Sequence, residues 1–111
     1  MLKCSNMVVS ACLKRGVDLT VPVRYKAMME EVGFVDTKEV MIEWPIGTWA
    51  RSKHHKRIGA WYYHDLNMGI EGVTMGLFTR VLGMSKEAVL DIVEDVKQDM
   101  NNRKIHGYQA L

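Results

Sequence analysis

The chain has 111 residues, a length that supports a single domain (residues 1–111) with one small hydrophobic core. Its composition, 48% hydrophobic and 25% charged, is ordinary for a globular protein and excludes a disordered or low-complexity chain. The formal net charge is only +2, from 15 basic and 13 acidic side chains, so the molecule as a whole is not drawn to nucleic acid, although a local basic patch could be.

Cysteine usage and hydropathy indicate the compartment. Cys4 and Cys12 lie eight residues apart on one predicted helix, about 12 Å apart at the helical rise, which is too far for a disulfide bond. Reduced thiols are typical of cytosolic and nuclear proteins. No apolar run approaches the roughly 20 residues of a membrane span, and the N-terminus lacks the apolar core of a signal peptide. We therefore expect a cytoplasmic or nuclear protein without a membrane segment.

Two short helices are predicted first. Residues 5–15 form a helix that stops at Gly16, because glycine tolerates the left-handed conformation found at helix C-termini. A second helix opens at Thr20 and Pro22, where the missing N–H of proline costs little, and closes at Gly33. The apolar faces of the two helices consist of Met7, Val8, Ala11 and Cys12, and of Tyr25, Met28, Met29 and Val32.

One strand is predicted over residues 34–44. Its alternation of apolar and polar residues is imperfect and becomes apolar toward Trp44, as expected for a strand whose start is exposed. Pro45 has no N–H to donate to a ladder and is expected to end the strand. Residues 105–111 could begin a second strand.

A long or kinked helix is predicted over residues 52–82, with Gly83 at its end. Ser85 then caps a final helix over residues 85–100, in which apolar residues recur at helical spacing. These residues are Val89, Ile92, Val93, Val96 and Met100.

Three glycines, Gly69, Gly72 and Gly76, share one face of the long predicted helix. Such a face lets a ligand approach the backbone or, more commonly, lets another helix pack closely. We expect the helix of residues 85–100 to pack on it.

Aromatic residues cluster around the predicted loop and the start of the long helix: Trp44, Trp49, Trp61, Tyr62, Tyr63 and, further away, Tyr25. They could line a pocket for a flat natural product, or they could form part of the core and anchor a loop.

The basic residues of segment 51–57 also have two interpretations. They could form a solvated face, or they could bind an acidic partner, a phosphate or nucleic acid; the lack of aromatic residues within the segment disfavours single-stranded nucleic acid.

Motifs for metals and nucleotide-type cofactors are missing from the sequence. No HExxH, CxxC or paired-carboxylate spacing occurs, so no metal site is predicted. No GxGxxG, nor any GxG, occurs either, so the chain offers no recognisable cradle for a nucleotide-type cofactor. His64 beside Asp65 could provide acid–base chemistry, although an ordinary hydrogen-bonded histidine is the commoner case.

Several segments together carry a family resemblance: residues 29–36 (MEEVGFVD), 44–49 (WPIGTW), 58–61 (IGAW), 69–72 (GIEG), 77–85 (LFTRVLGMS) and 103–108 (RKIHGY). Taken jointly, they resemble the C-terminal third of fungal methyltransferase-like proteins of the secondary-metabolism regulator group. Those proteins are similar to S-adenosylmethionine-dependent methyltransferases.

The resemblance implies an α+β, mostly helical fold, the C-terminal remnant of a class I (Rossmann-like) methyltransferase fold that lacks the cofactor-binding half. The family's glycine-rich motif and acidic ribose contact would precede anything present here, so no cofactor-binding residue carries over and S-adenosylmethionine belongs to the full-length family only. The resemblance transfers candidates for a substrate pocket alone: Trp49, Trp61, Tyr62 and His64.

Three functions stay open. The chain could be a truncated methyltransferase-family protein of secondary metabolism that cannot methylate alone. It could be a non-methylating enzyme or accessory protein that binds a small-molecule natural product in an aromatic pocket. It could also be a regulatory binding module that self-associates or pairs with a protein partner, since one strand with an open edge invites pairing. Nucleic acid is not an expected partner.

Overall fold

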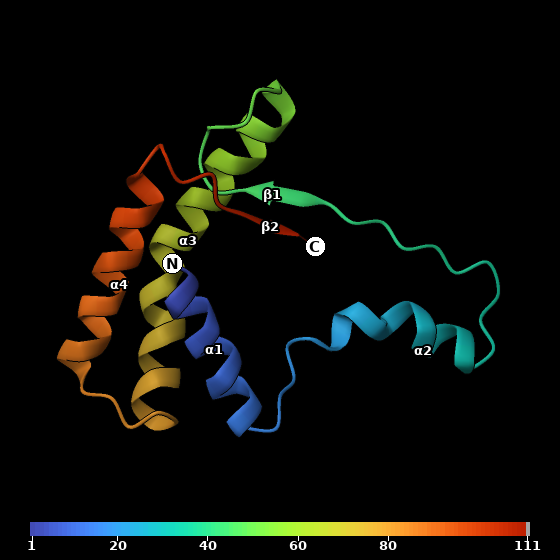
Figure 1. Cartoon of the computed structure of the whole chain (residues 1–111), viewed down its shortest axis with the longest axis horizontal. Helices are drawn as coiled ribbons and strands as arrows, with labels where there is room; N and C mark the ends of the chain where they lie inside the picture. The colour runs from blue at the N-terminus through green and yellow to red at the C-terminus, as the bar shows by residue number, and fades with distance from the viewer. Residues whose placement is uncertain (111) are drawn as a thin grey trace.

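The computed structural model describes residues 1–110 and is mostly helical, with one small sheet (Figure 1). This confirms the predicted balance of helix and strand. The elements in chain order are α1 (Leu2–Lys14), a 3-10 turn η1 (Val21–Arg24), α2 (Tyr25–Glu31), β1 (Glu43–Pro45), α3 (Lys53–Arg80), α4 (Lys86–Asn101) and β2 (Tyr108–Ala110).

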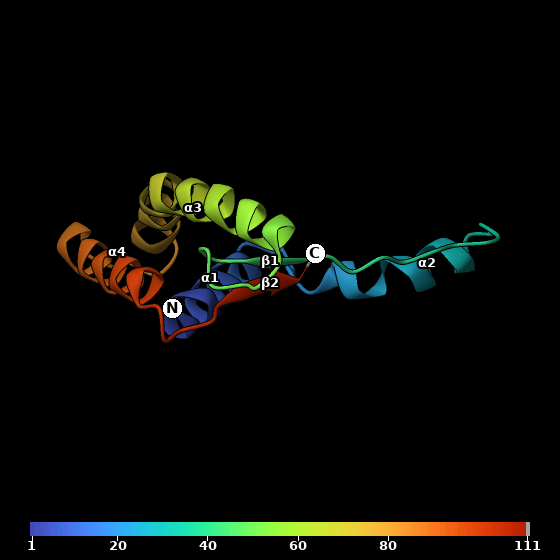
Figure 2. The same cartoon turned by 90° about the horizontal axis from the view of Figure 1, so that it is seen from above.

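The body of the molecule is built on α3, with α1 and α4 packed along it (Figures 1 and 2). Phe78 of α3 is fully buried among apolar side chains of α4. The buried residues of this cluster are Cys4, Phe78, Val89, Val93, Val96 and Met100. The stripe predicted for the last helix is therefore confirmed as the side that forms the core, with Ile92 at its edge. Cys4 and Cys12 are both free thiols.

Local end signals place the helices where the sequence predicted them. Ser52 and Ser85 accept hydrogen bonds on Oγ from the N–H groups of His55 and Ala88, at 3.1 and 3.2 Å. Gly16, Gly33 and Gly83 follow helices with φ of +80°, +103° and +67°. One boundary was wrong, because α1 begins at Leu2 and not at residue 5.

The predicted strand over residues 34–44 was wrong over most of its length. Only Glu43–Pro45 is a strand, and it pairs antiparallel with β2, with Glu43 opposite Ala110 and Pro45 opposite Tyr108. Since β2 has three residues, it offers no backbone partner to the rest of the segment, and Asp36 interrupts it at φ +56°. The strand ends at Pro45, as predicted, with Pro45 as its last paired residue. A strand within 105–111 is confirmed for Tyr108–Ala110, whereas Leu111 lies outside the described residues.

The segment of residues 21–42 forms an arm that projects from the body, with α2 apart from the other helices in both views (Figures 1 and 2). The apolar face predicted for α2 therefore meets no core, and its residues are exposed. The projection raises the radius of gyration to 16.6 Å, against about 13 Å for a compact chain of this length.

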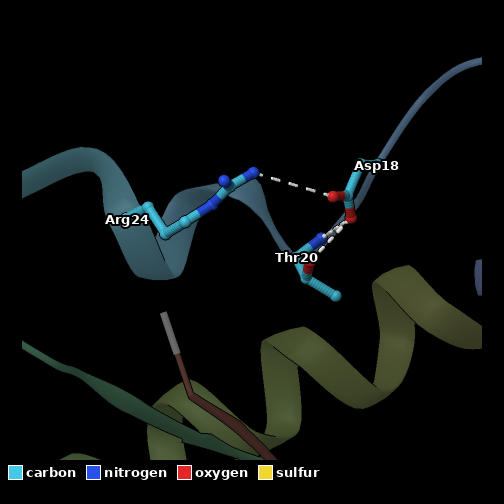
Figure 3. Close-up of polar contacts among 3 residues, drawn as sticks. All are labelled: Asp18, Thr20 and Arg24. Atoms are coloured by element: carbon cyan, nitrogen blue, oxygen red, sulfur yellow. Dashed lines mark hydrogen bonds and ion pairs between the residues drawn. The ribbon is translucent and has the colours of Figure 1, made fainter. Parts of the chain in front are cut away.

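The arm starts from a small polar turn (Figure 3). The Asp18 carboxylate accepts hydrogen bonds from the Thr20 N–H at 2.9 Å and from the Thr20 hydroxyl at 2.6 Å, and it faces Arg24 at 3.9 Å. These bonds hold the pKa of Asp18 below its usual value, the hydroxyl bond first. The turn fixes the chain direction just before η1.

The expected packing of α4 on the glycine face was also wrong. A Cβ placed on Gly69, Gly72 or Gly76 would have open space around it, because α4 packs on the opposite side of α3, around Phe78. Close approach occurs instead at Gly59, which is buried against the loop that follows β1.

Candidate functional site

The four residues predicted to line a substrate pocket lie on two segments. Trp49 belongs to the loop between β1 and α3, while Trp61, Tyr62 and His64 lie on α3. Trp61 and His64 are three residues apart and share one side of α3, whereas Tyr62 is turned by about 100° from Trp61. Trp61 is 73% exposed and His64 is exposed, whereas Tyr62 is half-buried. The structure thus does not gather the four into one group, and their role as a substrate pocket stays a prediction.

Tyr62 joins α3 to the two-stranded sheet. Its ring lies edge-on to Trp44 of β1, with ring centroids 5.6 Å apart, and its hydroxyl donates a hydrogen bond to Oε1 of Gln109 in β2. Burial, followed by the nearby charge of Asp65, raises the pKa of the Tyr62 phenol. The side chain therefore stays protonated and able to donate this bond at neutral pH.

Trp49 anchors the loop after β1 to the segment after α4. Its indole Nε1–H donates to the Gly107 carbonyl at 3.1 Å, and its ring stacks on His106 at 4.7 Å with the planes 6° apart. Of the two readings of the aromatic cluster, these contacts match the loop anchor. The sequence prediction missed His106 as the partner, because 57 residues separate it from Trp49.

The connection from β1 through residues 46–52 to α3 is the place to test for a nucleotide-type cofactor, since such cofactors sit on a strand–loop–helix. The Ile46 N–H donates to the Gly107 carbonyl at 2.9 Å, and the Gly47 N–H donates to the Gly59 carbonyl at 3.0 Å. Two donors of this connection are thus used within the chain, and the absence of a cradle for S-adenosylmethionine stays a prediction. Gly59 is the structural residue that the sequence reading missed; its position within the WPIG–IGAW pair of motifs was the available signal.

An apolar hollow of about 880 Å³ lies between α1, α3 and the two-stranded sheet. Tyr62, Leu66 and Ile70 of α3 line it together with Val8 of α1. Tyr62 is the predicted pocket residue that lines this hollow, whereas Trp49 lines two smaller hollows, one of which shares Ile46, Met100 and Ile105 with it. Its size and apolar lining are those of sites that take small molecules.

Within residues 1–110, no group of three His, Cys, Asp or Glu side chains is arranged to hold a metal ion. No helix in this range is both long and apolar enough to cross a membrane.

Comparison with known proteins finds relatives among fungal proteins. The secondary metabolism regulator LAE1 of Cochliobolus heterostrophus is 40% identical over 89 residues, 79% of this chain and 29% of that protein. The probable methyltransferase tdiE of Emericella nidulans is 26% identical over 103 residues, 93% of this chain and 32% of that protein. The protein-methionine methyltransferase laeA of the same organism is 24% identical over 106 residues, 90% of this chain and 28% of that protein.

These relatives confirm the resemblance to fungal methyltransferase-like proteins of the secondary-metabolism regulator group, which extends over most of the chain. The chain spans less than a third of the length of the curated relatives it matches. No protein-family model matches the chain. No solved structure matches it either.

Proposed function

From the relationship to fungal methyltransferase-like regulators, we propose that the chain is a methyltransferase-family protein of secondary (natural-product) metabolism that cannot transfer a methyl group alone. The observation that carries the proposal is its similarity, over most of its length, to relatives named as secondary-metabolism regulators and methyltransferases. In this proposal the chain corresponds to the late part of a Rossmann-like fold, after the cofactor-binding half. The free thiols of Cys4 and Cys12 support a cytoplasmic or nuclear location.

The backbone around β1 supports the proposed inability to methylate alone. The Ile46 and Gly47 N–H groups already donate to the Gly107 and Gly59 carbonyls, so these two groups are not free to bind a cofactor carboxylate or ribose.

Isothermal titration of the full chain with S-adenosylmethionine tests this proposal. We expect no measurable heat of binding from protein that shows a cooperative thermal melt. A dissociation constant in the micromolar range would overturn it, because a cofactor site would then exist without the glycine turn.

Pairing with a partner chain or a second copy is the complementary proposal, and the arm supports it. Val32, Phe34 and Val35 expose most of their side chains there, and β2 is paired on one edge only within the described residues. A binding module would cover these surfaces when it pairs.

A cofactor-independent role on a natural product is favoured by a different observation, the apolar hollow at Tyr62. A flat natural product bound there would lie against the Tyr62 ring and would protect it from solvent. Titration of the chain with an aromatic polyketide, followed by Tyr and Trp fluorescence, tests this role. Tyr62→Leu should weaken quenching, and quenching that Tyr62→Leu leaves unchanged would place the ligand elsewhere.

A further inference from the structure

The segment after α4 passes close to the loop before α3 (Figure 1). Residues of both segments line a second, polar hollow of about 450 Å³. Lys56 reaches it from the first turn of α3, and Arg103 and His106 reach it from the segment after α4. The lining also contains Thr48, Trp49 and Asn102, and its apolar members are Ile46, Met100 and Ile105. The fold therefore brings together cationic and polar side chains from two segments that lie 47 residues apart, Lys56 and Arg103.

The hollow is positively charged and has no carboxylate in its lining. The ion pairs described among residues 1–110 join Met1 to Asp99, Arg24 to Asp18 and Lys26 to Glu30, so none of them neutralises Lys56 or Arg103. Glu43 is the acidic side chain of the other hollow that Trp49 lines, where it lies with Arg51 and His55, and Asp99 lines the adjoining apolar hollow.

The stability of α3 does not explain why these cationic side chains lie together. Lys53, Lys56 and Arg57 lie in the first two turns of α3, where positive charge opposes the helix dipole. Bringing Arg103 to the same place adds repulsion between like charges. An anion in the hollow would offset both costs.

The ring stack gives the hollow a fixed wall. Trp49 is held by its bond to the Gly107 carbonyl, and the His106 ring lies parallel to it, so the stack limits how the His106 ring can turn within the lining. Arg103 supplies a planar fork of donors, Lys56 a point charge, and the Thr48 hydroxyl and Asn102 amide supply neutral donors. These are the groups that bind a phosphate in other proteins.

We propose that this basic hollow binds the phosphate group of a small phosphorylated ligand. The volume is large enough for a pyrophosphate or a nucleotide and small for a macromolecule. The site adjoins the apolar hollow at Tyr62, with which it shares Ile46, Met100 and Ile105, but Lys56, Arg103 and His106 line the basic hollow and not the apolar one. The proposal rests on these side chains and not on the proposed methyltransferase relationship.

Calorimetric titration of the full chain at low salt with pyrophosphate, ATP and adenosine tests the proposal. We expect pyrophosphate and ATP to bind and adenosine not to bind. ATP binding more tightly than pyrophosphate would identify a nucleotide as the source of the phosphate, and equal affinity would identify the phosphate group alone. Binding of adenosine as tight as that of ATP would overturn the proposal.

A matched pair of variants locates the site. The double change Lys56→Gln, Arg103→Gln should weaken pyrophosphate binding about tenfold or more, because two charge-assisted contacts are lost. The double change Arg80→Gln, Lys86→Gln is the control: it removes the same two positive charges where α3 ends and α4 begins, about 20 Å or more away by the helical rise. An equal loss in both proteins would mean that general charge, not the hollow, attracts phosphate and would overturn the proposal.

Nucleic acid is the competing occupant of any basic surface. A single-stranded oligonucleotide that binds far more tightly than ATP, with an affinity that the Lys56→Gln, Arg103→Gln change leaves intact, would replace the proposal with an extended nucleic-acid surface. Both variant sites are exposed, so the variants should retain the thermal melt of the parent protein.

Discussion

Gly59 is the glycine with the least space for a side chain. It brings α3 against the loop after β1, where the Gly47 N–H donates to its carbonyl at 3.0 Å. An added Cβ would overlap the Gly47 carbonyl oxygen and would lie 3.2 Å from the Pro45 carbonyl oxygen. Since both are backbone atoms, no side chain can turn away to make room. We expect Gly59→Ala to lower the free energy of unfolding by about 1–3 kcal/mol or more, as measured by urea denaturation.

Gly69→Ala and Gly72→Leu are the matched controls for Gly59→Ala. A Cβ at either position meets open space, so only helix propensity changes, and stability should rise by up to about 1 kcal/mol. If the last helix packed on the glycine face, as the sequence predicts, a leucine at position 72 would instead overpack that contact and lower stability. If all three substitutions destabilised the protein alike, close approach would not be peculiar to Gly59.

We expect Tyr62 to contribute to the free energy of unfolding in a pH-dependent way. Tyr62→Phe removes the hydroxyl that donates to Gln109, and we expect a loss of about 0.5–1.5 kcal/mol at neutral pH. Because burial raises the pKa of this phenol in the folded state, the contribution is complete below the unfolded value of about 10 and is lost as pH rises through the folded pKa. The difference in unfolding free energy between Tyr62→Phe and the parent protein should therefore shrink between neutral and strongly alkaline pH. A difference that grows with pH would contradict this assignment.

At the scale of single elements, the turn of Asp18 fixes how the arm begins. Asp18→Ala removes the acceptor of both Thr20 bonds, and we expect faster hydrogen exchange at the Thr20 amide and no change at the α1 amides. Since the pKa of Asp18 is lowered in the folded state, the turn is complete above the unfolded value of about 3.9 and is lost as pH falls through the folded pKa. Asp18→Asn keeps an acceptor oxygen but cannot titrate. Its Thr20 amide should therefore lack the acid transition, and a transition that persists in Asp18→Asn would assign it to another group.

The elements that could be predicted from sequence are those whose signals are local. Ser85 bonds to an amide three residues later, and Gly16 ends the helix immediately before it, so neither depends on distant parts of the chain. A strand depends on a partner, and β1 finds its partner only beyond α3 and α4. Residues 34–42 have the composition of a strand but no neighbour to pair with, which is why that prediction was wrong.

The candidate sites depend on contacts that no local pattern encodes. Tyr62 meets Gln109 and Trp49 meets Gly107, and in both cases the partner lies near the end of the described chain. The basic residues of segment 51–57 were visible in the sequence, but the addition of Arg103 was not, because it requires α4 to return the chain to the start of α3.

At the scale of the whole molecule, the arm leaves apolar surface in water. Val35 is 84% exposed and Met41 is 70% exposed, on a segment that adds length to the molecule without adding to its core. Contiguous apolar surface of this kind marks contact sites in soluble proteins. The body, in contrast, has its own core around Phe78, so it can fold whether or not the arm is covered.

We therefore expect the chain to self-associate at tens of micromolar in sedimentation velocity experiments. Replacing Phe34, Val35 and Met41 together with serine should shift it to monomer, because it removes apolar surface from the arm alone. Val73→Ser is the control, since Val73 is 61% exposed but lies on α3. The arm variant should keep the thermal melt of the body, whose core it does not touch. A parent protein that sediments as a clean monomer at these concentrations, with a cooperative melt, would show that the arm does not drive association between copies, and a hetero-partner would then have to cover it.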